Sequence, residues 1–212
     1  MEIVIIENYL KARYLFFKWR YNLNVVQKVT LALSMACLTG FAAQIKIAIP
    51  WTPIPITGQT FAVLLSGVLL GMWWGGISQA LYVTIGAIGV PWFSGGNGGY
   101  MFLLGPTGGY IFGFILAALF IGYFADKYIR TRKFIPMLAI MLFANFVLIY
   151  IPGMIQLGLW SNMIAGVTPT LWQLLLMGMI PFVIGDVTKI VIAATIATSI
   201  TPKENFSRLA DF

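Results

Sequence analysis

Apolar residues come in long, unbroken runs, which are separated by short stretches rich in proline, glycine or charge. A membrane-crossing helix needs about 20 apolar residues, whereas strands of a membrane β-barrel show short segments of alternating polarity. The runs therefore predict an all-α integral membrane protein. We expect six transmembrane helices, over residues 25–49, 59–70, 77–90, 105–125, 134–160 and 181–199.

The connections are expected to be a proline-containing loop, a tight Trp-bearing turn over residues 71–76, a Gly-rich stretch over residues 91–104 and a polar turn over residues 161–170. The last apolar run, residues 171–200, is too long for one straight span at about 1.5 Å per residue. Pro181 divides it, and proline favours the first position of a helix. We therefore expect a short interfacial helix over residues 171–179 before the sixth span.

Composition agrees with a membrane protein, because only 9% of the residues are charged, against roughly 25% in an average soluble domain. The chain has no histidine and a single cysteine, Cys37, which excludes a disulfide framework and a thiolate metal site. No GxxxxGK[ST] phosphate loop occurs, so we expect no ATP hydrolysis by this chain and no cofactor. A clear inverted repeat is missing too, which argues against a self-contained carrier.

The net charge of +7 could indicate nucleic acid, but in a membrane protein it more often reports which loops face the cytoplasm. In the six-span arrangement eleven of the 13 basic residues fall on one side: Lys11, Arg13, Lys18, Arg20, Lys28, Lys127, Arg130, Arg132, Lys133, Lys203 and Arg208. This side is therefore expected to be cytoplasmic, together with both termini, and no nucleic-acid partner is expected.

Three regions follow from this pattern: residues 1–24, a membrane domain over residues 25–200, and a cytoplasmic tail over residues 201–212. In residues 1–24 the apolar part precedes the basic part, which is the reverse of a signal peptide. This segment is either a cytoplasmic interfacial helix or an unstructured basic leader.

The candidate site is centred on Asp186 and Lys189, which share one face of the sixth span at i, i+3 spacing. Ionisable groups within a span usually mark a site or a pathway, although a structural ion pair is the alternative. We favour a site, because other polar residues gather near the same outer mouth: Gln59, Asn97, Asn145, Tyr150 and Gln156.

This set of groups suits a small polar ligand that bears a carboxylate. Asn97 and Asp186 can together donate to and accept from an amide or urea, and Lys189 or Lys46 can neutralise an acid. The apolar wall, or alternatively a headgroup belt, is expected from Trp51, Trp92, Phe93, Tyr100 and Tyr150. The glycines at positions 95–99 form either a flexible lid over the site or a simple connection.

A stripe of small residues runs along the first span at four-residue spacing: Ala32, Ala36 and Gly40. Such stripes let another helix come close. The approaching helix could belong to this chain or to another protein.

Three segments resemble the BioY family, whose members are the biotin-binding substrate (S) components of energy-coupling-factor (ECF) transporters. The segments are PWTPIPITGQTFAVLLSGVLLG (50–71), GGNGGYMFLLGPTGGYIFGF (95–114) and PFVIGDVTKIVIAA (181–194). The resemblance covers roughly residues 25–200 and does not extend to residues 1–24.

The resemblance implies a six-helix protein of the bacterial-type plasma membrane that captures biotin from outside without chemistry on it. In the family an Asn and an Asp that match Asn97 and Asp186 bind the ureido ring, and further matches fall on Lys189 and Tyr150. The stripe of Ala32, Ala36 and Gly40 matches a contact with the membrane coupling subunit, which works with two ATPase subunits.

Alternatives from other classes stay open at this point. The chain could be a solitary biotin carrier that works without ATPase partners, or it could take up another small vitamin-like carboxylate. A membrane-embedded enzyme or scaffold is the remaining class. The lack of histidine, and of a second acid within reach of Asp186, argues against catalysis.

Overall fold

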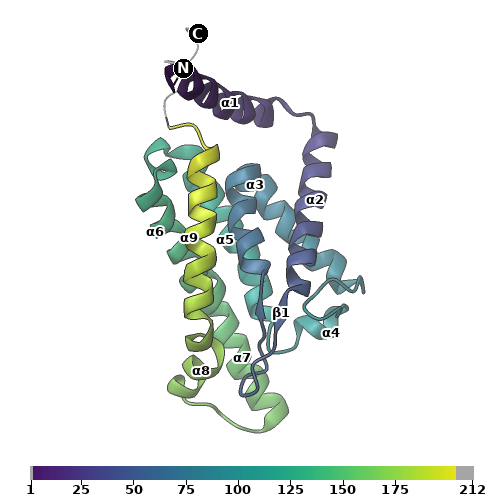
Figure 1. Ribbon diagram of the computed structural model, residues 1–212. Coiled ribbons are helices and arrows are strands. Elements are labelled where there is room, and N and C mark those ends of the chain that lie inside the picture. Colours follow the sequence, from purple (N-terminus) through teal and green to yellow (C-terminus); the bar gives the residue numbers. More distant parts are fainter. Residues whose placement is uncertain (1, 204–212) are drawn as a thin grey trace.

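The computed structural model describes residues 2–203, so residues 204–212 of the expected tail lie outside it. Its helices are α1 (Glu2–Asn22), α2 (Val25–Gln44), α3 (Gln59–Ala87), α4 (Tyr100–Leu103), α5 (Gly108–Lys127), α6 (Phe134–Phe143), α7 (Tyr150–Ala165), α8 (Leu171–Gly178) and α9 (Val183–Ile200). The longer ones pack side by side, and α1 lies across one end of the bundle (Figure 1).

Shorter elements complete the described part of the chain. Two 3-10 turns, η1 (Ile129–Arg132) and η3 (Ile180–Phe182), and a π-helix, η2 (Ala144–Ile149), connect or interrupt the helices. Two short strands, β1 (Lys46–Ile47) and β2 (Ile56–Thr57), pair antiparallel, so the proline loop is the tip of a hairpin. The expected first span is therefore shorter than residues 25–49, because its last residues enter this hairpin.

The start of α2 follows from its local sequence. Asn24 accepts a hydrogen bond from the backbone of Gln27, and the Gln27 side chain accepts one from the backbone of Asn24. This reciprocal capping box satisfies two backbone donors that a helix start would leave unpaired. It places the first residue of the helix at Val25, as the apolar pattern predicted.

The chain reverses direction inside α3. Gly71 has φ 80° and ψ −178°, a conformation that residues with a side chain rarely adopt. Gln59 donates to the hydroxyl of Tyr82 at 2.7 Å, and a Cβ atom on Gly75 would lie 2.9 Å from the Cα of Gly67. In a straight helix, residues this far apart in sequence could not touch. Residues 59–70 and 72–87 therefore form an antiparallel helical pair.

Two expected boundaries need correction. The predicted turn over residues 71–76 is wrong in extent, because Gly71 alone breaks the helix and helical geometry resumes with Met72. The predicted turn over residues 161–170 begins too early, because α7 continues through Ala165 and ends at Gly166, which has φ 65°. Polar residues such as Ser161 and Asn162 are accommodated in the last turn of this helix.

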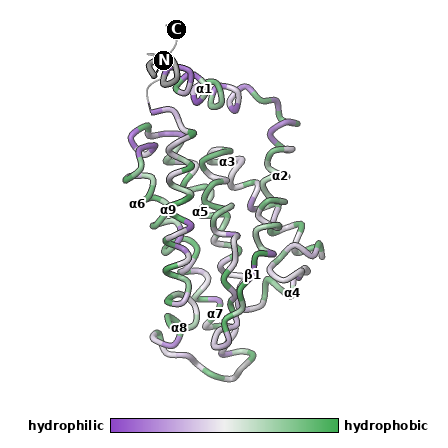
Figure 2. Tube along the Cα trace, in the orientation of Figure 1, coloured by the Kyte–Doolittle hydropathy of each residue, from purple (hydrophilic) through white to green (hydrophobic). Residues whose placement is uncertain are grey.

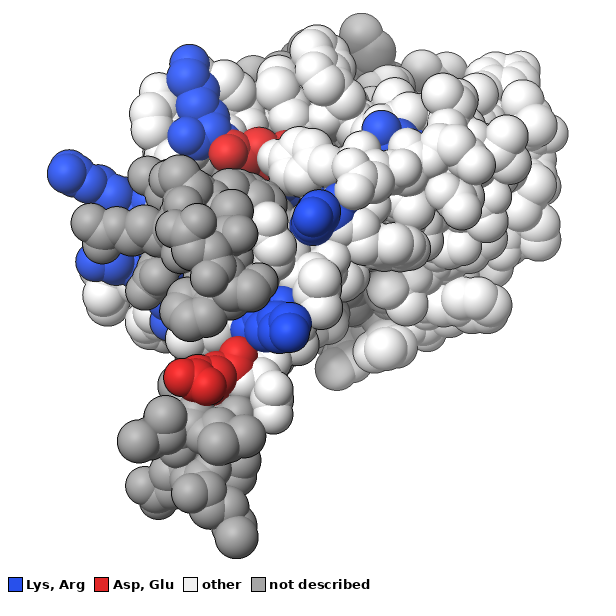
Figure 3. Space-filling view, turned by 90° about the horizontal axis from the view of Figure 1, so that it is seen from above, with Lys and Arg blue, Asp and Glu red and all other residues white. Residues whose placement is uncertain are grey.

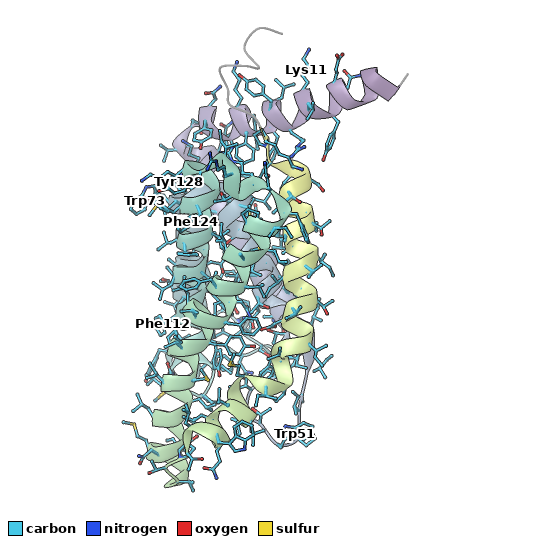
Figure 4. All side chains as sticks on the ribbon, turned by 90° about the vertical axis from the view of Figure 1, so that its left-hand side faces the viewer. Lys11, Trp51, Trp73, Phe112, Phe124 and Tyr128 are labelled. Carbon is cyan, nitrogen blue, oxygen red and sulfur yellow. The ribbon has the colours of Figure 1, made fainter. Side chains whose placement is uncertain are left out.

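The surface of the bundle is apolar. Five helical stretches of the described chain are long and apolar enough to cross a membrane, and two of them, Phe134–Ile164 and Leu171–Ile200, each run through several of the elements named above. Apolar positions follow the bundle, and hydrophilic ones concentrate at the α1 end (Figure 2). Exposed aromatic side chains lie at both ends, with Trp73 and Tyr128 near α1 and Trp51 at the far end, while Phe112 faces outward between them (Figure 4). This distribution is typical of a protein with two aromatic belts.

Residues 2–22 are helical, so the unstructured-leader alternative for residues 1–24 is wrong. Arginines from α1 bind backbone carbonyls where other helices end: Arg13 donates to Thr198 and Thr201, and Arg20 donates to Val68 at 3.0 Å. Cations are favourable at helix C-termini, whose last carbonyls lack partners. Arg20 also pairs with Asp126, and several Lys and Arg side chains are exposed on this end (Figure 3).

Candidate functional site

A cavity lies between the β-hairpin, α3, α5, α7 and α9. Four of the five expected ligand-binding residues line it: Gln59, Tyr150, Asp186 and Lys189. These four come from three separate helices, so the fold brings together residues that are far apart in the sequence. The cavity lies in the half of the bundle remote from α1, on the side of α8 and β1 (Figure 1).

Asp186 is the centre of the polar groups in this cavity. Its side chain is buried, and its Oδ1 lies 2.5 Å from Nζ of Lys189. Its Oδ2 accepts hydrogen bonds from the Tyr150 hydroxyl at 2.6 Å and from Nδ2 of Asn145 at 2.9 Å. A buried charge is costly unless it is paired and hydrogen-bonded, and this carboxylate has both kinds of partner. The environment therefore holds Asp186 in one orientation at the cavity wall.

The π-helix η2 explains how one helix supplies two of these partners. The backbone N–H of Tyr150 donates to the carbonyl of Asn145, five residues earlier. Residues five apart are one turn apart in π-geometry, so both side chains reach the same carboxylate oxygen. A π-turn within a helix is often found at a functional site. Asn145 is fully buried but does not line the cavity, so it positions Asp186 through its hydrogen bond without facing the ligand space.

Lys189 connects α9 to the hairpin. Its Nζ donates to the carbonyl of Thr57 at 3.0 Å in addition to its contact with Asp186. Thr57 in turn donates from its hydroxyl to Oε1 of Gln59 at 2.9 Å, and Gln59 donates to Tyr82. These bonds form one network from the carboxylate to the start of α3. The polar atoms of Gln59 are thus already engaged with protein groups.

Asn97 does not line the cavity. Its side chain is exposed, and its Nδ2 donates to the carbonyl of Ser94 at 2.7 Å within the Gly-rich loop. Gly95 and Gly96 have φ 76° and 71°, which lets the loop turn tightly between these two residues. The residue that this loop contributes to the cavity is Ser94, which the sequence did not single out. A ligand contact by Asn97 therefore requires a different conformation of the loop.

The apolar wall differs from the expected one. Of the five aromatic residues proposed for it, only Tyr150 lines the cavity, whereas Trp51 and Tyr100 are exposed. Trp92 and Phe93 instead pack on Tyr82 with ring centroids 5.3 and 5.4 Å apart. The aromatic residues that line the cavity besides Tyr150 are Phe102, Tyr110, Phe114 and Phe182. Apart from the i, i+4 spacing of Tyr110 and Phe114, no sequence signal set these residues apart from ordinary core residues.

The small-residue stripe of α2 is covered by the chain itself. Ala32 and Ala36 are fully buried, and a Cβ on Gly40 would lie 3.1 Å from Cβ of Trp92. Small side chains let α3 and the loop that carries Trp92 approach α2 closely. Within the described residues the stripe is therefore packed internally, and a contact of Ala32, Ala36 and Gly40 with a partner subunit stays a prediction.

The geometry supports non-covalent binding of a small molecule with both apolar and polar parts. Most of the wall is apolar, and one end carries an ion pair whose carboxylate is fixed by three side chains. Such a combination of apolar wall and few fixed polar groups is typical of ligand pockets.

Comparison with known proteins points to one family. The model of the BioY family matches residues 13–205, which extends the match into α1, beyond the segments in which the resemblance was visible. A probable biotin transporter BioY of Methanothermobacter thermautotrophicus is 56% identical over 147 residues, 69% of this chain and 94% of the relative. A biotin transporter BioY of Thermotoga maritima is 40% identical over 151 residues, 71% of this chain and 83% of the relative.

A solved structure has the same fold. It is described as the S-component for biotin from an ECF-type ABC transporter, and it superposes with a TM-score of 0.73 at 27% sequence identity. The match covers 86% of this chain and 95% of that structure.

Proposed function

Because this chain belongs to the BioY family, we propose that it captures biotin at the outer face of a membrane as the substrate-binding subunit of an ECF-type transporter. One observation carries the proposal: a largely apolar cavity ends in a carboxylate, Asp186, that Lys189, Tyr150 and Asn145 hold in place. Biotin combines an apolar body with a urea and an acid, which suits this arrangement. The proposed role is transport without chemistry on the ligand.

The proposed ligand contacts follow from the chemistry of the cavity. Asp186 accepts a hydrogen bond from a ureido N–H, and Lys189 donates its remaining N–H to the ureido oxygen. Gln59 contributes to the wall through its packing, because its amide is bonded to Tyr82 and Thr57. Asn97 joins the site when its bond to Ser94 is exchanged for one to the ligand.

The proposed membrane arrangement has six crossings, with both termini cytoplasmic, in a plasma membrane of the bacterial type. The chain reversal at Gly71 supports the sixth crossing, because it turns the span candidate Gln59–Ala87 into two antiparallel segments. The basic residues of α1 and η1 at one end support the orientation through the positive-inside rule. Under this arrangement α1 lies at the cytoplasmic interface, and α8 lies at the outer one.

The proposed partners are a membrane coupling subunit and two ATPase subunits. The chain has no GxxxxGK[ST] nucleotide phosphate loop, so ATP-driven uptake would use ATPase subunits from other proteins. The second candidate is a solitary biotin carrier. Uptake of labelled biotin by cells that make this chain, with and without the coupling and ATPase subunits, separates the two. Uptake that requires the partners supports the first, and full uptake without them supports the second.

Titration of the purified protein with biotin tests the binding function itself. We expect saturable binding of one biotin per chain. Thiamine and riboflavin at the same concentrations serve as controls for other vitamins, and equal binding of these ligands would contradict the assignment to biotin.

A further inference from the structure

Two groups of polar side chains stand out among those that line the cavity. In the first group each donor already has a protein acceptor. Tyr110 donates to the carbonyl of Gly178 at 2.8 Å, and Tyr150, Gln59, Thr57 and Lys189 donate as described above. These contacts hold the wall together, and most of the donors in this group are occupied before a ligand arrives.

The second group contains Thr60 and Ser94. Their hydroxyl oxygens are buried, and neither has a hydrogen-bond partner among the described residues. Both residues line the cavity, and only 5% of Ser94 is exposed. A buried hydroxyl without a partner costs free energy, and native proteins keep few of them. Unpaired groups at a cavity wall therefore indicate a partner that is supplied by the ligand.

The two hydroxyls come from separate elements that are each held firmly. Thr60 lies in the first turn of α3, next to Gln59, whose amide is bonded on both sides. Ser94 follows Phe93, whose ring stacks on Phe102 at 5.1 Å and whose carbonyl accepts a hydrogen bond from Gln44 at 3.2 Å. Groups on fixed elements are suited to recognition, because little freedom is lost when a ligand binds.

We infer that the hydroxyls of Thr60 and Ser94 are two further ligand-binding groups, which donate hydrogen bonds to acceptor oxygens of the captured molecule. The inference rests on the proposed biotin-binding function. Asp186 is an acceptor and suits the N–H side of a urea, so free hydroxyl donors complement it by serving the oxygens. Biotin offers two kinds of acceptor oxygen, the ureido carbonyl and the carboxylate.

The test uses the full-length protein with Ser94→Ala and Thr60→Val, titrated with biotin and with biotin methyl ester. Each variant should bind biotin about 3- to 10-fold more weakly, as expected for one lost hydrogen bond. If a variant loses less affinity for the methyl ester than for biotin, relative to the wild type, its hydroxyl binds the carboxylate. If the loss of affinity is equal for the two ligands, the hydroxyl binds the ureido oxygen.

A second readout distinguishes ligand binding from a structural role. Because the hydroxyls have no protein partner, ligand-free Ser94→Ala and Thr60→Val should unfold at the same temperature as the wild type or slightly above it. The rise in unfolding temperature that saturating biotin causes should be smaller in these two variants than in the wild type. Ser34→Ala and Thr188→Val are matched controls, because these exposed hydroxyls bond to their own helix backbones, and they should change neither quantity.

Wild-type affinity in both variants would overturn the inference, and so would ligand-free unfolding temperatures that fall in step with affinity. The wild-type titration separates this outcome from failure of the proposed function. If the wild type binds biotin and the variants bind it equally well, only the inference fails. If the wild type binds no biotin, the proposed function fails.

Discussion

Asn145 and Tyr150 donate hydrogen bonds to the same oxygen, Oδ2 of Asp186, at 2.9 and 2.6 Å, although they lie five positions apart on one helix. The π-turn between them makes this possible. The two hydrogen bonds connect the fifth apolar run to α9 at the cavity wall. The orientation of the carboxylate thus depends on a local departure from α-helical geometry.

Replacing Asn145 with Leu should weaken biotin binding by about 3- to 30-fold, because one donor to Asp186 is lost and the carboxylate is held less firmly. Isothermal titration measures the effect. In an Asp186→Asn background the same replacement should add little further loss, since the two residues act as one unit. Asn162→Leu, at an exposed position on α7, is the control and should bind like the wild type. Additive losses in the double variant would contradict a positioning role.

Replacing Asp186 with Asn should weaken biotin binding by roughly 10-fold or more, because a charged acceptor is removed and Lys189 loses its counter-ion. The measurement is a titration of detergent-solubilised protein, with unfolding temperatures recorded in parallel. Asp126→Asn removes the other described carboxylate of the helical bundle, which lies at the opposite end, and should leave affinity unchanged. Undiminished affinity in Asp186→Asn would remove this residue from the site.

Replacing Gly71 with Ala should destabilise the protein by about 1–3 kcal/mol, because the reversal within α3 needs φ near 80°. A Cβ at this position would also meet the Asp126 side chain. Gly158→Ala is the control, because a Cβ there makes ordinary contacts with Leu174 in a regular helix. Thermal unfolding in detergent measures both. Equal unfolding temperatures for the two variants would show that the reversal does not depend on glycine.

Replacing Arg20 with Ala should lower stability by roughly 1–3 kcal/mol, because Asp126 loses its partner and a helix-end carbonyl loses its donor. Biotin affinity should stay at the wild-type value, since α1 crosses the end of the bundle remote from the cavity. Thermal unfolding and titration give the two quantities. Lys18→Ala changes an exposed cation of the same helix and should alter neither. A large loss of affinity in Arg20→Ala would indicate coupling between the two ends.

The proposed orientation predicts which positions react with a membrane-impermeant maleimide in intact cells. In a Cys37→Ser background, Trp51→Cys should be labelled from outside, and Arg130→Cys should be labelled only after the membrane is opened. Both residues are exposed, and they lie in loops assigned to opposite sides. The reverse labelling pattern would contradict the assignment of α1 to the cytoplasmic side.

Much of the helical arrangement could be predicted because membrane spans depend on runs of apolar residues, which are visible in one dimension. The start of α2 at Val25 and the short helix α8 before the last span agree with the predictions. The extents of the turns were harder to predict. A single glycine can reverse a chain, and polar residues such as Ser161 can end a helix as well as begin a turn.

The site was partly predictable for a different reason. Ionisable and amide side chains are rare within spans, so Asp186, Lys189 and Gln59 stood out and do line the cavity. Ser94 and the aromatic wall could not be selected, because serine and phenylalanine are common in helices and loops of every kind. The burial of Ala32 and Ala36 depends on which helix packs beside α2, which spacing alone does not determine.

The most direct test of the central claim is a titration of the purified wild-type protein with biotin, run beside Asp186→Asn. The account predicts saturable binding of one biotin per chain that is weakened by roughly 10-fold or more in the variant. A folded wild-type protein that does not bind biotin, or a variant that binds it equally well, would contradict the account.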